Sequence, residues 1–211
     1  LRLIFQPAEE GLRGAAAMVA AGVLDGVDLF FGFHIGVQAL QTGELIAGYK
    51  NILASSKLDV TFKGVPAHAG ISPHIGRNAL LAAAIATQAL HALPRHGLGD
   101  TRVNVGRFFG GDSRNTIASS AKIELEIRAD STEVLAHLDE MAERTILGAA
   151  QTQGVEATIE KCGQSCAGNS DADLTRFIAG FGKGLDTVTK LRMEADFKGS
   201  DDAAVMMDAV Q

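Results

Sequence analysis

The stretch "SSKLDVTFKG" (residues 55–64) alternates polar and apolar side chains, which is the pattern of a strand with one buried face. An apolar segment of helical length, "NALLAAAIATQALHAL" (78–93), follows it and stops before Pro94. Two further strand-like segments, 101–111 and 116–130, lie on either side of a glycine-rich turn. This region therefore begins as strand, helix, strand and strand.

The same region closes with a second helix and a last strand. "STEVLAHLDEMAERTILGAAQTQG" (131–154) starts at Ser131, a favoured N-cap residue, and ends at Gly154, a glycine suited to terminate a helix. "VEATIEKC" (155–162) has strand character. The order from 55 to 162 is thus β-α-β-β-α-β, which predicts a ferredoxin-like domain of about a hundred residues.

The flanking segments indicate a different kind of domain. "LRLIF" (1–5) and "DLFFGFHIG" (28–36) are short and apolar like buried strands, and an alanine-rich helix pattern (11–24) lies between them. This order of strand, helix and strand predicts a right-handed parallel crossover in a sheet covered on both faces. After residue 165, two more helices are expected over 173–185 and 201–210.

We therefore expect an α/β domain with a parallel sheet, formed by residues 1–52 and 165–211, that is interrupted by the inserted ferredoxin-like domain at 53–164. The chain begins with Leu in a strand-like stretch and stops within a helix pattern, so the α/β domain is expected to be incomplete at both ends.

Composition excludes several classes of function. The 211 residues carry a net charge of −6, which argues against nucleic acid as a partner, and no apolar run is long enough to span a membrane. Cys162 and Cys166 lack the CxxC spacing, so reduced thiols are favoured over a metal or redox pair, and a cytoplasmic location follows weakly.

The segment "FQPAEEG" (5–11) places two carboxylates, Glu9 and Glu10, directly after the first expected strand. Neighbouring residues of an extended chain face opposite sides, so the two acids are expected to have different tasks. They could instead begin the next helix, where its dipole favours acidic residues. His34, near the end of the next expected strand, favours a functional site.

Several motifs together resemble the two-metal aminoacylase and carboxypeptidase family of amidohydrolases. They are "FQPAEEG", "FGFHIG", "GVPAHAG", "GGDSRNTIASSAKIELEIRAD" and "GSDDAAVMM", and they occur in the family's order along essentially the whole chain. The resemblance implies a metallopeptidase-like catalytic α/β domain, with the inserted domain acting in dimerisation and as a lid. It also implies that the amide bond of an N-acyl or N-aroyl amino acid is cleaved, with p-aminobenzoyl-glutamate as the favoured substrate.

By this resemblance, Glu9 is the general base, Glu10 a ligand of one metal ion and His34 a ligand of the other. A pair of divalent ions about 3.5–4 Å apart activates a shared water and polarises the amide carbonyl, and a nearby carboxylate accepts the proton of the water. Carboxylate and imidazole ligands suit manganese, zinc or cobalt, and the resemblance favours manganese or zinc.

The resemblance assigns four further residues. His68 matches a histidine that stabilises the oxyanion in the active site of the partner protomer, which implies a homodimer; a related second subunit is a further possible partner. Asn115 and Arg128 match residues that bind the substrate near the scissile amide and at its carboxylate. Gly199 matches a glycine near the substrate. A surface histidine, an exposed strand charge and a helix-terminal loop are the alternatives for His68, Arg128 and Gly199.

The sequence also departs from the family. The upstream metal ligands and the final histidine ligand are absent from the 211 residues, and Asp201 stands where the family often has glutamate. Two other functions stay open: an aminoacylase or hippuricase-like hydrolase with another acyl group, and a non-catalytic relative that keeps the fold but not the metals.

Overall fold

The computed structural model describes residues 1–210. The chain forms two compact units. The first contains Leu1–Ala54 and Ser165–Gln211, and the second contains Ser55–Gln164. Each unit is described by itself below.

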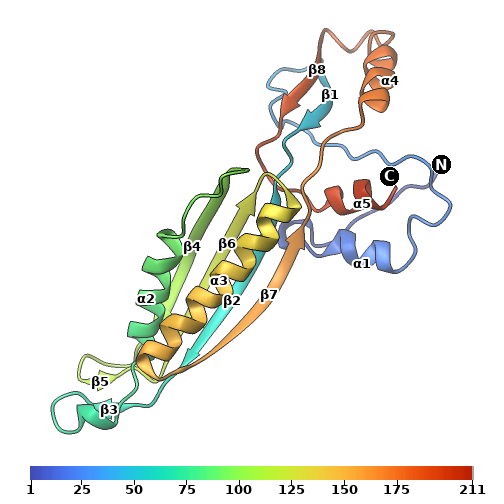
Figure 1. The fold of residues 1–211 in the computed structure, drawn as a ribbon. Coiled ribbons are helices and arrows are strands. Elements are labelled where there is room, and N and C mark those ends of the chain that lie inside the picture. Colours follow the sequence, from blue (N-terminus) through green and yellow to red (C-terminus); the bar gives the residue numbers. More distant parts are fainter. Residues whose placement is uncertain (211) are drawn as a thin grey trace. The chain divides into compact units, whose positions relative to one another are not determined.

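The second unit is a four-stranded sheet with two helices. Figure 1 shows both helices on one face of the sheet, whose strand order is β4-β6-β2-β7. The elements are β2 (Ala54–Lys63), α2 (Ala79–His91), β4 (Thr101–Gly110), β6 (Ser120–Ala129), α3 (Thr132–Gln153) and β7 (Glu156–Ser165). Their order along the chain is the β-α-β-β-α-β order expected from the sequence.

Alternating side chains form the core of this unit. Leu58, Val60 and Phe62 of β2 are buried, and so is every second residue of β6, including Ile123 and Ile127. Because successive strand residues face opposite sides, this alternation places one apolar row under the helices and leaves a polar row on the other face.

The helix ends follow their capping residues. The side chain of Asn78 accepts a hydrogen bond from the Leu81 amide at 3.0 Å, and Ser131 accepts one from the Val134 amide at 3.1 Å. Gly154 ends α3 with φ +63°, a left-handed conformation that glycine adopts without strain. The expected N-cap and C-terminal glycine of α3 are confirmed.

A small two-stranded sheet lies at one end of the second unit. It pairs β3 (Ala67–His68) with β5 (Thr116–Ile117), so that His68 lies opposite Thr116. A short 3-10 helix, η2 (Pro73–Ile75), follows β3.

The first unit contains a parallel pair, β1 (Glu44–Lys50) and β8 (Lys190–Asp196), with α4 (Ala172–Gly182) packed against it. A 3-10 helix, η1 (Glu9–Gly11), and two short helices, α1 (Gly14–Ala20) and α5 (Ala203–Ala209), complete the unit. Helices α1 and α5 pack on each other.

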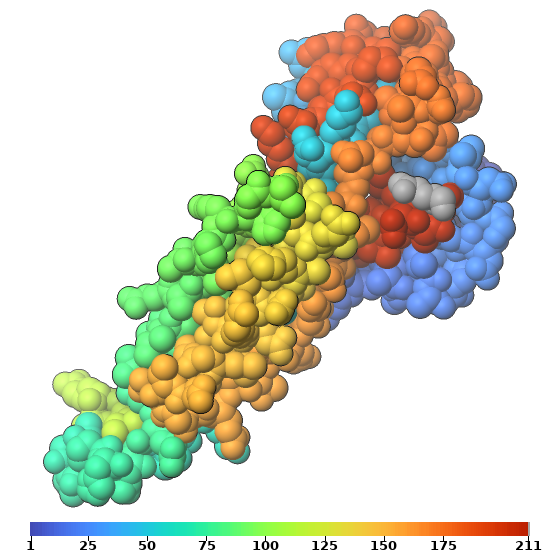
Figure 2. Space-filling model, in the orientation of Figure 1, coloured from blue at the N-terminus to red at the C-terminus, as the bar shows by residue number. Residues whose placement is uncertain are grey.

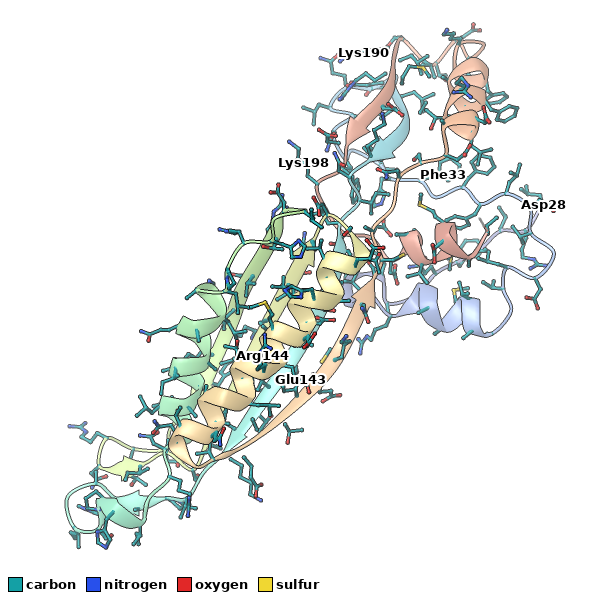
Figure 3. The ribbon with its side chains drawn as sticks, viewed as in Figure 1. Asp28, Phe33, Glu143, Arg144, Lys190 and Lys198 are labelled. Carbon is teal, nitrogen blue, oxygen red and sulfur yellow. The ribbon has the colours of Figure 1, made fainter. Side chains whose placement is uncertain are left out.

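Two of the strand predictions are wrong. Residues 1–5 and 28–36 form no ladder with any described strand, so the predicted crossover between them is absent from the described part of the chain. Two of their apolar side chains are largely uncovered: Phe5 is 86% exposed and Phe33 is 85% exposed. Figure 3 labels Phe33. An apolar pattern specifies a strand only when a neighbouring strand supplies the hydrogen bonds. The expected helix over 11–24 is also shortened to α1.

The sequence interpretation missed both strands of the parallel pair. β1 and β8 contain charged residues at their ends, and Glu44 lies opposite Lys190 in the register. Its side chain is 3% exposed and forms an ion pair with Lys190 at 3.0 Å. Among the described residues, no helix combines the length and apolar character needed to span a bilayer.

Candidate functional site

The turn that carries Glu9 and Glu10 is a 3-10 helix and not the end of a strand. Ala8 precedes it with φ 57°, a left-handed conformation that reverses the chain after Pro7. A Cβ added at Gly14 would lie 1.6 Å from the Pro7 carbonyl oxygen, so only glycine allows α1 to begin this close to the turn. Glu9 is thereby half-buried, whereas Glu10 is exposed.

Asp202 joins three segments of the first unit. Its side chain is fully buried and accepts hydrogen bonds from the Ala15 amide at 3.0 Å and from the side-chain amide of Gln6. Asp202 immediately precedes α5, and Ala15 lies in the first turn of α1. The carboxylate therefore holds the start of both helices beside the Glu9 turn.

Asp201 connects the same place to His34. One carboxylate oxygen accepts a hydrogen bond from the Ala203 amide at 2.7 Å, and the other contacts Nε2 of His34. The His34 ring also packs on Phe197, with 5.2 Å between ring centroids. A carboxylate that bonds to one nitrogen of an imidazole orients the ring and leaves the other nitrogen available to a ligand.

These contacts place the carboxylates of Asp201 and Asp202 close to that of Glu9. Ligand atoms of Glu9, Asp201 and Asp202 all lie within 4.8 Å of one another. Partial burial, followed by the negative charges of Asp201, Glu10 and Asp202, raises the pKa of Glu9, and His34 opposes this shift. Proximity of like charges makes the anionic form less favourable, and such a group is suited to accept a proton or to share a cation.

The donor set fits a divalent metal ion. Both aspartates already accept two hydrogen bonds each, so Glu9 is the carboxylate of the three that these bonds leave able to accept a proton beside a bound ion. Oxygen donors with a nearby imidazole are the ligands that zinc and manganese accept in proteins. Of the predicted site residues, Glu9 lies in this cluster, and His34 reaches it through Asp201. The ligand role of Glu10 stays a prediction.

The second unit brings His68 and Asn115 together. The Ala69 amide donates a hydrogen bond to the Asn115 carbonyl at 2.9 Å, next to the pairing of β3 with β5. Both residues are exposed. Nδ1 of His68 accepts hydrogen bonds from the amides of Gly70 and Ile71 at 3.1 and 3.2 Å. The histidine is therefore held by its own turn.

Arg128 lies on the polar face of the sheet. Its guanidinium bonds to Glu126 at 2.8 Å, and Ser55 donates a hydrogen bond to the other oxygen of that carboxylate at 3.0 Å. In the register of β4 and β6, Arg128 lies directly opposite Arg102. Substrate binding by Arg128 stays a prediction, because a substrate carboxylate would compete with Glu126.

Gly199 lies between β8 and α5, and its carbonyl accepts a hydrogen bond from the Leu53 amide at 2.8 Å. An added Cβ would lie 3.0 Å from the Phe197 ring, so a side chain here would press on the ring that supports His34. The carbonyl thus has a structural partner, and the predicted substrate contact is untested.

The remaining histidines and the cysteines lie outside this cluster. The rings of His96 and His137 meet edge to face with 5.2 Å between their centroids, and His91 accepts a hydrogen bond from the Val105 amide at 3.3 Å. Cys162 and Cys166 are free, and desolvation by burial raises the pKa of both thiols. A raised pKa keeps a thiol protonated, which disfavours a metal or redox role.

Sequence interpretation missed the structural role of Asp202 and the contact of Asp201 with His34. The available signal was a pair of carboxylates, "SDD", directly before an apolar helix pattern. That pattern is also typical of a helix start, so its connection to Gln6, Ala15 and His34 required the fold.

Comparisons with known proteins bear on both units. Residues 54–150 match the M20 peptidase dimerisation domain. A p-aminobenzoyl-glutamate hydrolase subunit homolog of Haemophilus influenzae is 38% identical over 211 residues, which are 100% of this chain and 50% of that protein. Indole-3-acetyl-aspartic acid hydrolase of Enterobacter agglomerans is 40% identical over 218 residues and is covered to 48%.

The solved structures agree with these relatives. The aminobenzoyl-glutamate utilization protein from Klebsiella pneumoniae superposes with a TM-score of 0.92 and 42% identity, over 99% of this chain and 53% of that protein. The chain spans about half the length of the curated relatives it matches.

Proposed function

We propose, from the match to the M20 peptidase dimerisation domain and from the relatives that align with the whole chain, that the chain belongs to the M20 family and that the full-length protein is a metal-dependent amidohydrolase. Its substrate is an N-acyl or N-aroyl amino acid, and p-aminobenzoyl-glutamate is the favoured one because relatives named for that substrate match the whole chain. The arrangement of Glu9 beside Asp201, which contacts His34, is the feature that supports this function most.

Each residue has a distinct task in the proposed reaction. Glu9 accepts a proton from the attacking water and delivers it to the amide nitrogen as the C–N bond breaks. The raised pKa of Glu9 suits this exchange, because a stronger base accepts the proton more readily. His68 donates a hydrogen bond to the carbonyl oxygen as negative charge develops there. Asn115 and Arg128 orient the amide and the carboxylate of the substrate, and Gly199 leaves room beside them.

We further propose that two divalent ions, manganese or zinc, bind at this site, with Glu10 and His34 among their ligands. Bound ions would supply Lewis acidity and lower the pKa of the attacking water. Asp201 and Asp202 hold the segments that carry these ligands, as neighbouring hydrogen-bonding groups do in other metal sites.

The first unit is the proposed catalytic domain, and the second is the proposed ferredoxin-like dimerisation and lid domain. The free state of Cys162 and Cys166 is compatible with the reducing cytoplasm that we favour as its location.

One face of the second unit suits a second copy of the chain. Helix α2 is apolar on nearly all sides, and the green segment that contains it lies at the surface in Figure 2. Its residues Leu80 and Leu81 are 37% and 46% exposed. The neighbouring edge strand β4 exposes Phe108 and Phe109 at 42% and 47%. The opposite edge strand, β7, exposes mainly charged and hydroxyl side chains, which protect an edge from pairing. We therefore place the homodimer contact at α2 and β4.

A second substrate class is supported by the relative named indole-3-acetyl-aspartic acid hydrolase, since it is as similar to this chain as the first relative. In both substrates an acyl group that contains an aromatic ring is linked through an amide bond to an acidic amino acid. A related second subunit is an alternative partner, because the first relative is named as the homolog of one subunit of its hydrolase.

A hydrolysis screen of the full-length protein tests the function. The protein is stripped with a chelator, reloaded with manganese, zinc or cobalt, and offered p-aminobenzoyl-glutamate, indole-3-acetyl-aspartate, hippurate and N-acetyl amino acids. We expect release of p-aminobenzoate and glutamate that depends on added metal. A protein that retains no metal ions and hydrolyses none of the compounds would instead be the non-catalytic relative.

A further inference from the structure

The turn after β3 bonds to the side chain of His68 and not only to its backbone. The amides of Gly70 and Ile71 both donate to Nδ1, at 3.1 and 3.2 Å. The His68 carbonyl accepts from the amides of Ile71 and Ser72 at 3.3 and 3.1 Å. The imidazole is thus one element of a closed hydrogen-bonded turn.

Neutral imidazole has one nitrogen that carries a proton and one that accepts a hydrogen bond. A nitrogen that receives two amide donors must be the acceptor, so the proton is on the other nitrogen. We propose that the turn amides of Gly70 and Ile71 fix His68 as the Nε2–H tautomer and make Nε2 its only hydrogen-bond donor. Gly70 and Ile71 are then positioning residues that act through His68.

The surrounding backbone keeps this turn in place. β3 pairs with β5 through Ala67 and His68, and the Ala69 amide bonds to the Asn115 carbonyl at 2.9 Å. The side chain of His68 is exposed, so Nε2 can reach a substrate. A donor whose tautomer is fixed before substrate arrives needs no rearrangement to stabilise negative charge on an oxygen.

This inference deepens the proposed function and rests on it for the role of the donor, but the tautomer itself can be measured independently. The metal-free, full-length protein is labelled with ¹⁵N-histidine, and the His68 signals are assigned by their loss in His68→Gln. At about pH 8, well above the reference pKa of a histidine side chain in a model peptide, we expect Nδ1 to have the shift of an unprotonated, hydrogen-bonded nitrogen and Nε2 that of a protonated one. The reverse assignment, or an even mixture of tautomers, would overturn the inference.

Two variants then test the donor atom in turnover. The amide nitrogen of His68→Gln lies near the position of Nε2, whereas that of His68→Asn lies near Nδ1, and the two differ by one methylene. We expect His68→Asn to lose about 10²–10³-fold in kcat with little change in KM, as for the loss of an oxyanion donor. His68→Gln should retain distinctly more activity. An equal loss in both variants, or a better His68→Asn, would contradict the use of Nε2.

The two experiments distinguish a failure of the tautomer assignment from a failure of the proposed function. If the parent protein hydrolyses none of the substrates, the proposed function fails while the NMR signals still decide the tautomer.

Discussion

Glu9 and Glu10 are neighbours in sequence, yet the fold gives them different surroundings. Glu9 is half-buried near two aspartates, and Glu10 is exposed. Opposite sides of a strand were the expected cause, but the residues form a 3-10 turn, in which successive side chains point about 120° apart. The prediction that Glu9 and Glu10 have separate tasks does not depend on which local structure forms, because adjacent side chains point in different directions both in a strand and in a 3-10 turn.

The first prediction concerns Glu9. Glu9→Gln in the full-length protein should lower kcat by on the order of a hundredfold or more, because an amide cannot accept the proton of the attacking water. Metal content, measured by elemental analysis, should stay near that of the parent. A variant that keeps activity within tenfold would remove the general-base role.

The second prediction concerns the metal ligands. Glu10→Ala and His34→Ala should each reduce the amount of metal retained after dialysis, and activity should fall with it. Excess metal in the assay should restore part of the activity in these variants but none in Glu9→Gln. Two ions retained by either alanine variant would count against its ligand role.

At the level of elements, the second unit could be predicted closely and the first could not. In the second unit, strands β2 and β6 alternate and both helices carry a capping residue, Asn78 or Ser131, so local signals agree with the final packing. In the first unit, residues 1–5 and 28–36 have strand-like sequences but no described strand pairs with them. The strands that do form, β1 and β8, are joined across more than a hundred residues of sequence, which local patterns do not reveal.

Some residues of the candidate site could likewise be predicted from sequence, and others could not. Glu9 and His34 follow apolar segments and could be selected from sequence, and motif resemblance added His68 and Asn115. The buried hydrogen bonds of Asp202 join residues 187 positions apart and depend on tertiary structure.

The third prediction belongs to α2. Leu81→Glu places a charge on the outward face of this helix and should shift the full-length protein from dimer to monomer in analytical ultracentrifugation. Leu147 of α3 is the matched control, because its side chain is also 46% exposed, but it lies beside Glu143 and Arg144, which are exposed as well (Figure 3). Leu147→Glu should remain dimeric. Dissociation by Leu147→Glu alone would move the interface to α3.

For the whole molecule, we propose that each active site combines Glu9 of one protomer with His68 of the other. The symmetry of a two-fold dimer gives both sites the same composition. A double defect in one site of a mixed dimer then leaves the other site intact.

Mixing inactive His68→Ala protomers with inactive Glu9→Gln protomers tests this claim most directly. Random exchange makes half of the dimers mixed, and each mixed dimer has one complete site, so activity should recover to roughly a quarter of the parental value. Exchange of protomers is verified separately with fluorescent labels. If exchange occurs and the mixture stays inactive, His68 does not act in the active site of its partner, and the shared-site account is contradicted.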